Sequence, residues 1–122
     1  MLFSVSGVVV RRSGRGTKLG FPTVNVSVTA PADWPYGSYA GYVLIEQQRY
    51  PAAIYYGPSL PVHLEAYLLD FSGNVYNQLV TIEGYQLIRL HEPIFDQTSL
   101  IQTIQSDINL VRQCLAALPK PA

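Results

Sequence analysis

Residues 14–25 combine backbone freedom, positive charge and neutral oxygens in a pattern suited to phosphate chemistry. The stretch contains three glycines, which are Gly14, Gly16 and Gly20. Glycine tolerates backbone angles closed to other residues, so the main chain there can approach a ligand closely. Backbone N–H groups of such a turn, with Arg15 and Lys18 beside them, could donate to phosphate oxygens. A glycine-rich hairpin loop with solvated cations is the alternative.

Thr23 and Asn25 end this stretch and are two residues apart. In an extended segment both side chains point to the same face, which places two neutral oxygens side by side. Oxygen ligands of this kind suit a Mg²⁺ ion bound to nucleotide phosphates.

Glu65 lies in the middle of a second extended segment, between Leu64 and Ala66. Alternation puts its side chain on the same face as Tyr67. A mid-strand carboxylate is unusual on a packed face and ordinary on a solvated one. The alternatives are therefore a solvated strand glutamate and a general base, which a rigid strand would hold in the geometry that proton transfer needs.

The sequence lacks the residue patterns of several other catalytic classes. His63 and His91 have no partners at zinc-ligand spacing. His91, next to Glu92 and Pro93, is typical of a surface loop. The chain contains no Gly-Lys-Ser/Thr phosphate loop and no Gly-x-Ser-x-Gly elbow.

The charge is unevenly distributed in a chain whose net charge is zero. Four of the eight cations precede the first acid, Asp33, and they are Arg11, Arg12, Arg15 and Lys18. A small basic end on a neutral chain favours a compact phosphate ligand over a long nucleic acid, which draws a wider basic surface. We therefore expect no nucleic-acid partner.

The hydrophobic pattern predicts one all-β domain over residues 1–122, a small antiparallel barrel followed by a helix. Strands are expected over residues 2–10, 22–28, 38–46, 49–56, 62–71 and 78–90, with a hairpin turn around Gln47 and Gln48. Helical spacing of apolar residues predicts a helix over residues 98–118, which Asp96 or Thr98 would cap and Pro119 would end. We expect this helix to pack against the barrel.

Nothing at the start has the form of a signal peptide, and no apolar run has the length of a membrane span. Cys114, the single cysteine, is expected to be a small buried hydrophobe. These features favour a cytoplasmic protein with no membrane partner.

Taken together, these residues resemble the riboflavin kinase family. Its glycine-rich motif, Gly-x-x-x-Gly-Phe-Pro-Thr-Ala-Asn, is similar to residues 16–25, with Val24 in place of alanine. The family's Pro-x-Gly-Val-Tyr is similar to residues 35–39, and its Val-Glu-x-His-Leu-Leu-Asp-Phe to residues 64–71. The closing phenylalanine and helix are similar to Phe95 and residues 98–118, so the resemblance covers essentially the whole chain.

The resemblance implies a six-stranded Greek-key barrel with a C-terminal helix, and transfer of the ATP γ-phosphoryl group to the 5′-hydroxyl of riboflavin. Thr23 and Asn25 would hold Mg²⁺, with Mn²⁺ or Zn²⁺ as alternatives, and Glu65 would be the general base. The segment around them would bind the nucleotide through Gly14, Arg15, Gly16, Lys18, Gly20, Phe21, Pro22, Thr23 and Asn25. The expected partners are riboflavin and ATP, and the expected state is a monomer.

Departures from the family pattern fall where the flavin is expected. The family's Asn/Ser-x-Gly-x-x-Pro-Thr-Phe is replaced by residues 55–61, which are shorter and lack the Thr-Phe. The family's Arg-x-Glu-x-x-Phe is replaced by residues 89–95, which are one residue longer. The candidate flavin contacts are Arg89, Tyr55, Tyr56 and Tyr67. The alternatives to a kinase are a flavin- or nucleotide-binding module with weak turnover and a small nucleic-acid-binding barrel.

Overall fold

The strands and the helix lie close to their expected positions. The computed structural model describes residues 1–10, 22–27, 33–58 and 63–119. The six strands and one helix are β1 (Phe3–Val8), β2 (Thr23–Ser27), β3 (Gly37–Ile45), β4 (Gln48–Tyr56), β5 (His63–Leu68), β6 (Leu79–Leu90) and α1 (Gln97–Ala117). Alternating apolar residues of high strand propensity explain the strands, and the switch to helical spacing after β6 explains α1.

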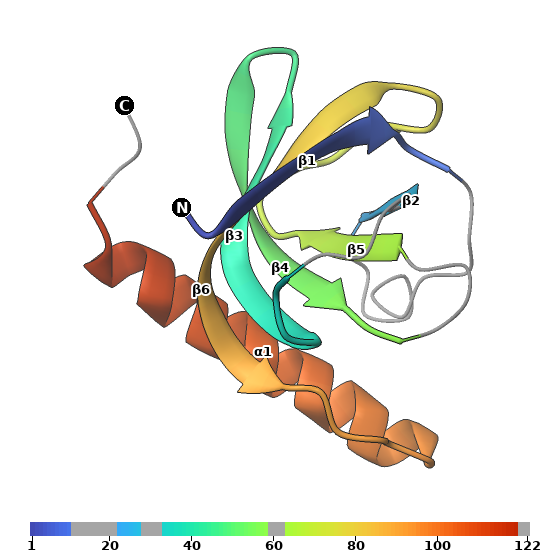
Figure 1. Ribbon diagram of the computed structural model, residues 1–122, viewed down its shortest axis with the longest axis vertical. Helices are drawn as coiled ribbons and strands as arrows, with labels where there is room; N and C mark the ends of the chain where they lie inside the picture. The colour runs from blue at the N-terminus through green and yellow to red at the C-terminus, as the bar shows by residue number, and fades with distance from the viewer. Residues whose placement is uncertain (11–21, 28–32, 59–62, 120–122) are drawn as a thin grey trace.

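The strands form one antiparallel sheet in the order β1-β6-β3-β4-β5-β2, which curls into a nearly closed barrel (Figure 1). β3, β4 and β5 follow one another as neighbours, and β6 returns beside β3, which is the Greek-key arrangement. The expected barrel class is confirmed.

The edge strands β1 and β2 meet at a seam. The backbone N–H of Val10 donates to the carbonyl of Asn25 at 2.9 Å. A Cβ at Gly7 would lie 2.4 Å from Cγ1 of Val26, far inside contact distance. Glycine at this position therefore lets the two edge strands approach and covers edges that would otherwise be exposed.

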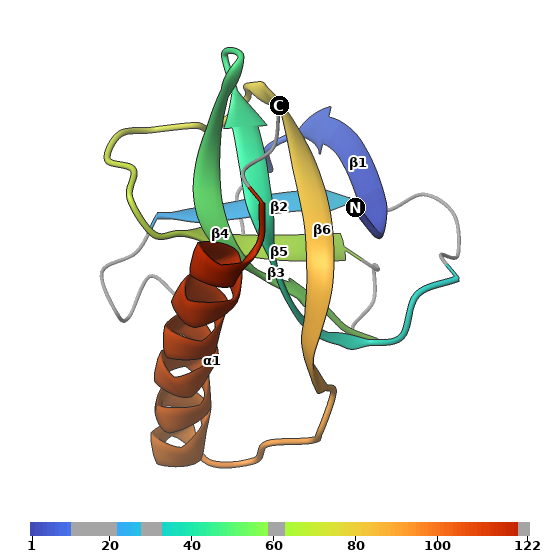
Figure 2. The same cartoon turned by 90° about the vertical axis from the view of Figure 1, so that its left-hand side faces the viewer.

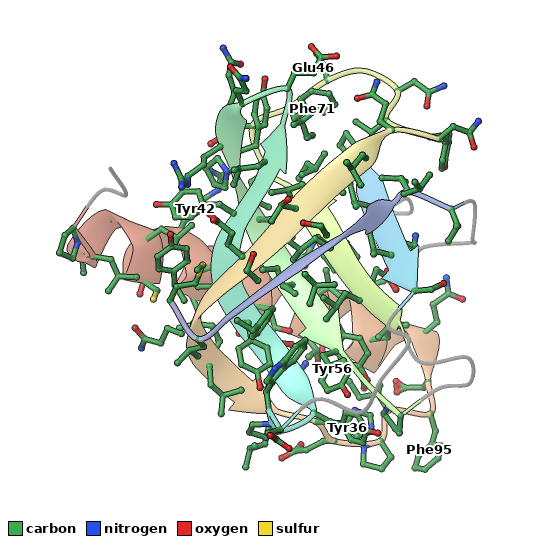
Figure 3. All side chains as sticks on the ribbon, turned by 45° about the horizontal axis from the view of Figure 1, so that its top comes forward. Tyr36, Tyr42, Glu46, Tyr56, Phe71 and Phe95 are labelled. Atoms are coloured by element: carbon green, nitrogen blue, oxygen red, sulfur yellow. The ribbon has the colours of Figure 1, made fainter. Side chains whose placement is uncertain are left out.

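The barrel interior is filled by aliphatic and aromatic side chains from all six strands. One end holds an aromatic cluster in which Trp34 stacks on Phe3 with ring centroids 3.9 Å apart. Tyr36 and Tyr56 lie together at this end (Figure 3), with ring centroids 4.9 Å apart. Several of the nine tyrosines thus serve packing.

α1 lies outside the barrel along β3, β4 and β6 (Figures 1 and 2). Its inward stripe meets Ala40 and Ala53, whose small side chains let the helix approach the sheet. The stripe consists of Ile104, Asp107, Ile108 and Val111, at the spacing of one helix face. The expected packing of the helix against the barrel wall is confirmed.

Local expectations at the turns and caps are partly corrected. The hairpin turn is centred one residue earlier than expected, on Glu46 and Gln47, which both have positive φ, as a two-residue type I′ connection requires. Asp96 caps α1 by accepting from the Ser99 backbone N–H at 2.9 Å. Cys114 is only half-buried, and its thiol donates to Oε1 of Gln86 at 3.1 Å.

Candidate active site

Five side chains from five strands form one row across the outer face of the barrel. Each is the direct register partner of the next, in the order Arg89, Ser38, Tyr55, Glu65 and Asn25. Direct partners in antiparallel strands project to the same face with Cβ atoms about 5 Å apart. We call this set the polar row. It places the predicted base next to one predicted metal ligand and, on its other side, next to a predicted flavin contact.

Asn25 ends the polar row on β2. Its side chain is almost completely buried, at 1% exposure. Among the described residues, its Oδ1 stands out as a buried side-chain oxygen without a hydrogen-bond partner. Leaving a buried carbonyl oxygen unsatisfied costs about 1–3 kcal/mol, so such an atom marks strain or a ligand.

Thr23 lies two residues before Asn25 and projects to the same face, opposite Tyr67 of β5. Its side chain is buried at 9% exposure. The two neutral oxygen-bearing side chains therefore lie side by side on a rigid strand, as the sequence pattern predicts. Pro22 continues the pairing, because its carbonyl accepts from the backbone N–H of Leu68 at 2.9 Å.

Glu65 lies between Asn25 and Tyr55, on the central strand of this part of the sheet. Its side chain is buried at 6% exposure although it faces outward from the barrel. The solvated-glutamate alternative therefore does not describe its surroundings. A buried carboxylate one strand away from two oxygen ligands is in position to take a proton from a group bound beside them.

A small hollow of about 10 Å³, room for about one water molecule, lies between the polar row and α1. Three members of the row line it, namely Arg89, Ser38 and Tyr55. Tyr67 and Ile54 contribute from the sheet, and the helix contributes Leu100, Thr103, Ile104 and Asp107. The lining thus combines aromatic and aliphatic surface with a few polar groups.

Arg89 is held rigidly at the far end of the row. Its Nε and Nη2 donate to the two carboxylate oxygens of Asp107, at 3.1 and 2.9 Å. Ser38 completes the set, since its hydroxyl donates to Asp107 at 2.9 Å and accepts from Arg89 at 3.1 Å. The hydrogen bonds to Asp107 raise the pKa of Arg89 above its ordinary value. The guanidinium is therefore fixed beside the hollow, with its charge paired to the carboxylate of Asp107.

Tyr55 shares a hydrogen bond with His91, with 2.7 Å between the hydroxyl and Nδ1. His91 follows β6, and its backbone N–H donates to the carbonyl of Tyr36 at 2.9 Å. It lies in the loop after β6, as expected, and is half-buried there.

The remaining predicted contacts separate into two groups. Tyr67 projects to the face of the polar row, opposite Thr23, and lines the hollow. Tyr56 projects to the opposite face, where it belongs to the barrel core at 3% exposure (Figure 3). Gly14, Arg15, Gly16, Lys18, Gly20 and Phe21 lie outside the described residues.

Sequence reasoning did not single out Ser38 or Asp107. For Asp107 a signal existed, because an acid falls within the helix stripe formed by Ile104, Ile108 and Val111. An acid on the packed face of a helix needs a buried partner, and Arg89 is that partner. Ser38 carries no comparable signal.

Comparison with known proteins places this geometry in context. The family model described as riboflavin kinase matches residues 1–115. A curated relative from Pseudomonas fluorescens, a bifunctional riboflavin kinase/FMN adenylyltransferase, is 28% identical over 120 residues. That match covers 93% of this chain but only 39% of the relative.

Two solved structures share the fold. A riboflavin kinase from Trypanosoma brucei superposes with a TM-score of 0.69 at 24% identity, covering 93% of this chain and 77% of that one. A protein from Streptococcus pneumoniae, titled a macrolide-efflux protein, superposes with a TM-score of 0.76 at 24% identity. It is covered over 38% of its length and this chain over 89%. At this identity both likenesses establish the barrel and helix alone.

Within the described ranges, no helix combines the length and apolar character that crossing a membrane requires.

Proposed function

The chain belongs to the riboflavin kinase family, and on that premise we propose that it phosphorylates riboflavin with ATP to give FMN and ADP. The proton of the ribityl 5′-hydroxyl passes to a carboxylate oxygen of Glu65. The freed oxygen forms a bond to the γ-phosphorus of ATP. The bond between that phosphorus and the β–γ bridging oxygen breaks, and ADP leaves. The juxtaposition of Asn25, Glu65 and Tyr55 in the polar row carries this proposal.

Asn25 and Thr23 fit a divalent cation accompanying the nucleotide. Oδ1 of Asn25 is buried without a partner, and the Thr23 hydroxyl belongs to the same face of β2. Neutral hard oxygens suit Mg²⁺ or Mn²⁺ better than Zn²⁺, which favours nitrogen and sulfur. When bound, such a cation would supply positive charge that offsets the phosphate charge. The predicted phosphate contacts of residues 14–22 directly precede this pair in the chain.

Glu65 is suited to the role of general base by its position rather than by unusual chemistry. It is buried on a strand that pairs on both sides, with β2 and β4. Phosphoryl transfer depends mainly on positioning and charge neutralisation, so a fixed carboxylate next to the cation ligands is sufficient.

Riboflavin would approach from the Tyr55 side of Glu65, because Asn25 and Thr23 occupy the other side. Tyr55, Tyr67 and Arg89 line the hollow there and remain the proposed flavin contacts. Their aromatic and cationic surfaces suit a planar ring system with carbonyl groups. Tyr56 would act through the core instead, because it packs behind this face.

The proposed setting is a monomer in the cytoplasm, where ATP is available as co-substrate. The chain spans 39% of the Pseudomonas relative, which is named for a second, FMN adenylyltransferase activity. We assign only the kinase half-reaction to the residues discussed above.

The test is direct product identification. The purified chain is incubated with riboflavin, ATP and Mg²⁺, and the products are separated by chromatography and identified by mass. Equal amounts of FMN and ADP are expected. Flavin binding without FMN would instead favour a binding module, and oligonucleotide binding that weakens with salt, without flavin binding, would favour a nucleic-acid-binding barrel.

A further inference from the structure

Two residues at which this chain departs from the family motifs contact each other. Tyr55 occupies the position of the motif's asparagine or serine, and His91 lies in the segment that is one residue longer than the motif. They are 36 residues apart in the chain, yet the Tyr55 hydroxyl and His91 Nδ1 are 2.7 Å apart. We infer that His91 is a positioning residue for the acceptor substrate, acting through Tyr55. This inference rests on the proposed kinase function.

The pair is anchored at both ends. Tyr55 lies on β4 in the centre of the polar row, between Glu65 and Ser38. His91 is tied by its backbone N–H to the carbonyl of Tyr36, at 2.9 Å. The imidazole therefore comes from a fixed point of the chain. The hydrogen bond adds to the packing of the Tyr55 ring against Gly57, and together they restrict the ring to one rotamer on a half-exposed face.

The location of the pair determines which substrate it affects. Tyr55 is one strand away from Glu65, on the side opposite Asn25. It also lines the hollow, with Arg89 and Tyr67. The Tyr55 ring, held against Gly57 and His91, forms a wall on the β4 side of the base, against which a planar acceptor would align. The proposed cation ligands Asn25 and Thr23 lie on the β2 side of Glu65, so they do not depend on this wall.

The chemical consequence is a constraint on the reacting hydroxyl. Displacing a reacting group by about 1 Å can lower a rate by about 100-fold, so a wall that orients the ring also orients the attached hydroxyl. His91 would contribute by keeping Tyr55 in one rotamer and would itself make no contact with the reacting atoms.

Three variants separate this role from a general effect on folding. Tyr55→Phe removes only the hydroxyl, His91→Leu removes the partner nitrogen, and His91→Asn retains a polar atom close to the position of Nδ1. Tyr50→Phe is the matched control, because it removes a hydroxyl that donates to Gln48 at 2.6 Å on the same strand. Tyr50 lies outside the polar row and packs near Phe71.

The readouts are the riboflavin Kd from flavin fluorescence, KM for riboflavin and for MgATP, kcat, and thermal unfolding. We expect Tyr55→Phe and His91→Leu each to raise the Kd and KM for riboflavin about three- to tenfold, as loss of one hydrogen bond implies. The double variant should be no worse than either single variant, because both remove the same bond. His91→Asn should restore most of the affinity, while KM for MgATP and the Tyr50→Phe control stay at the wild-type value.

Three results would overturn the inference: unchanged riboflavin parameters in both single variants, additive effects in the double variant, or an equal rise in KM for MgATP. These are distinct from failure of the proposed function, in which the wild-type chain itself neither binds riboflavin nor forms FMN. That result would overturn both.

Discussion

Replacing Asn25 with leucine should stabilise the protein while removing its response to MgATP. The two side chains have the same branching and number of non-hydrogen atoms, although the methyl groups of leucine are bulkier, and the site is 1% exposed, so leucine would occupy the same position. The change eliminates the partnerless Oδ1, whose burial costs about 1–3 kcal/mol. It also places an apolar side chain in a buried strand position. We expect the free energy of unfolding without nucleotide to rise by about 1–2 kcal/mol.

MgATP should reverse this order. At a concentration 100 times its Kd, a ligand that binds only the folded state adds about 2.7 kcal/mol of stability. Wild type would gain that amount, and the Asn25→Leu variant would gain little. The assay is urea unfolding with and without MgATP, with Asn109→Leu on the exposed face of α1 as the control. The reasoning is refuted if Asn25→Leu is less stable than wild type without nucleotide, or if MgATP stabilises both equally.

Three further perturbations test the framework of the site. Gly7→Ala should lower the free energy of unfolding by about 1–3 kcal/mol, because the added Cβ would be forced against Val26. The midpoint of thermal unfolding should fall accordingly, and an unchanged midpoint would contradict the close approach of β1 and β2. Asp107→Asn should lower the free energy of unfolding by about 2 kcal/mol, which is less than for a fully buried ion pair because the Arg89 side chain is 26% exposed. It should also weaken riboflavin binding. Unchanged unfolding and unchanged binding would exclude a role for the ion pair. The pKa of Asp96 is lowered by its hydrogen bonds in the first helical turn, so its contribution is present above the unfolded pKa of about 3.9 and lost as pH falls through the lower folded value. Circular dichroism below pH 4 should therefore show earlier loss of helix in wild type than in Asp96→Asn, in which the cap does not titrate; identical profiles would contradict this.

The elements could be predicted from sequence because each one has a local signal. Alternation of valines with Thr23 and Asn25 indicates β2, and apolar spacing after Asp96 indicates α1. Alternation also predicts that Tyr55 and Tyr56 point to opposite faces, so only one of them could line the site. Which one does so depends on strand register, a long-range property.

The neighbours within the site could not be predicted in this way. Asn25 and Glu65 pair through β2 and β5, which are far apart in sequence, and the pairing depends on how the whole sheet closes. Likewise, Arg89 alone gives no indication of Asp107, since the contact requires α1 to cross back over β6 and β3. Similarity to a family suggested such a neighbourhood for the proposed base and the proposed metal ligands. It could not do so for His91, which lies where the chain departs from the family motif.

The central claim is that Glu65 accepts the proton from the hydroxyl while neighbouring side chains hold the nucleotide and its cation. Single-turnover FMN formation by Glu65→Gln tests it most directly, with Glu46→Gln at the exposed hairpin turn as the control (Figure 3). We expect a rate about 10²–10⁴ times lower than wild type, with stabilisation by MgATP retained and the control at the wild-type rate. A rate within tenfold of wild type would contradict it.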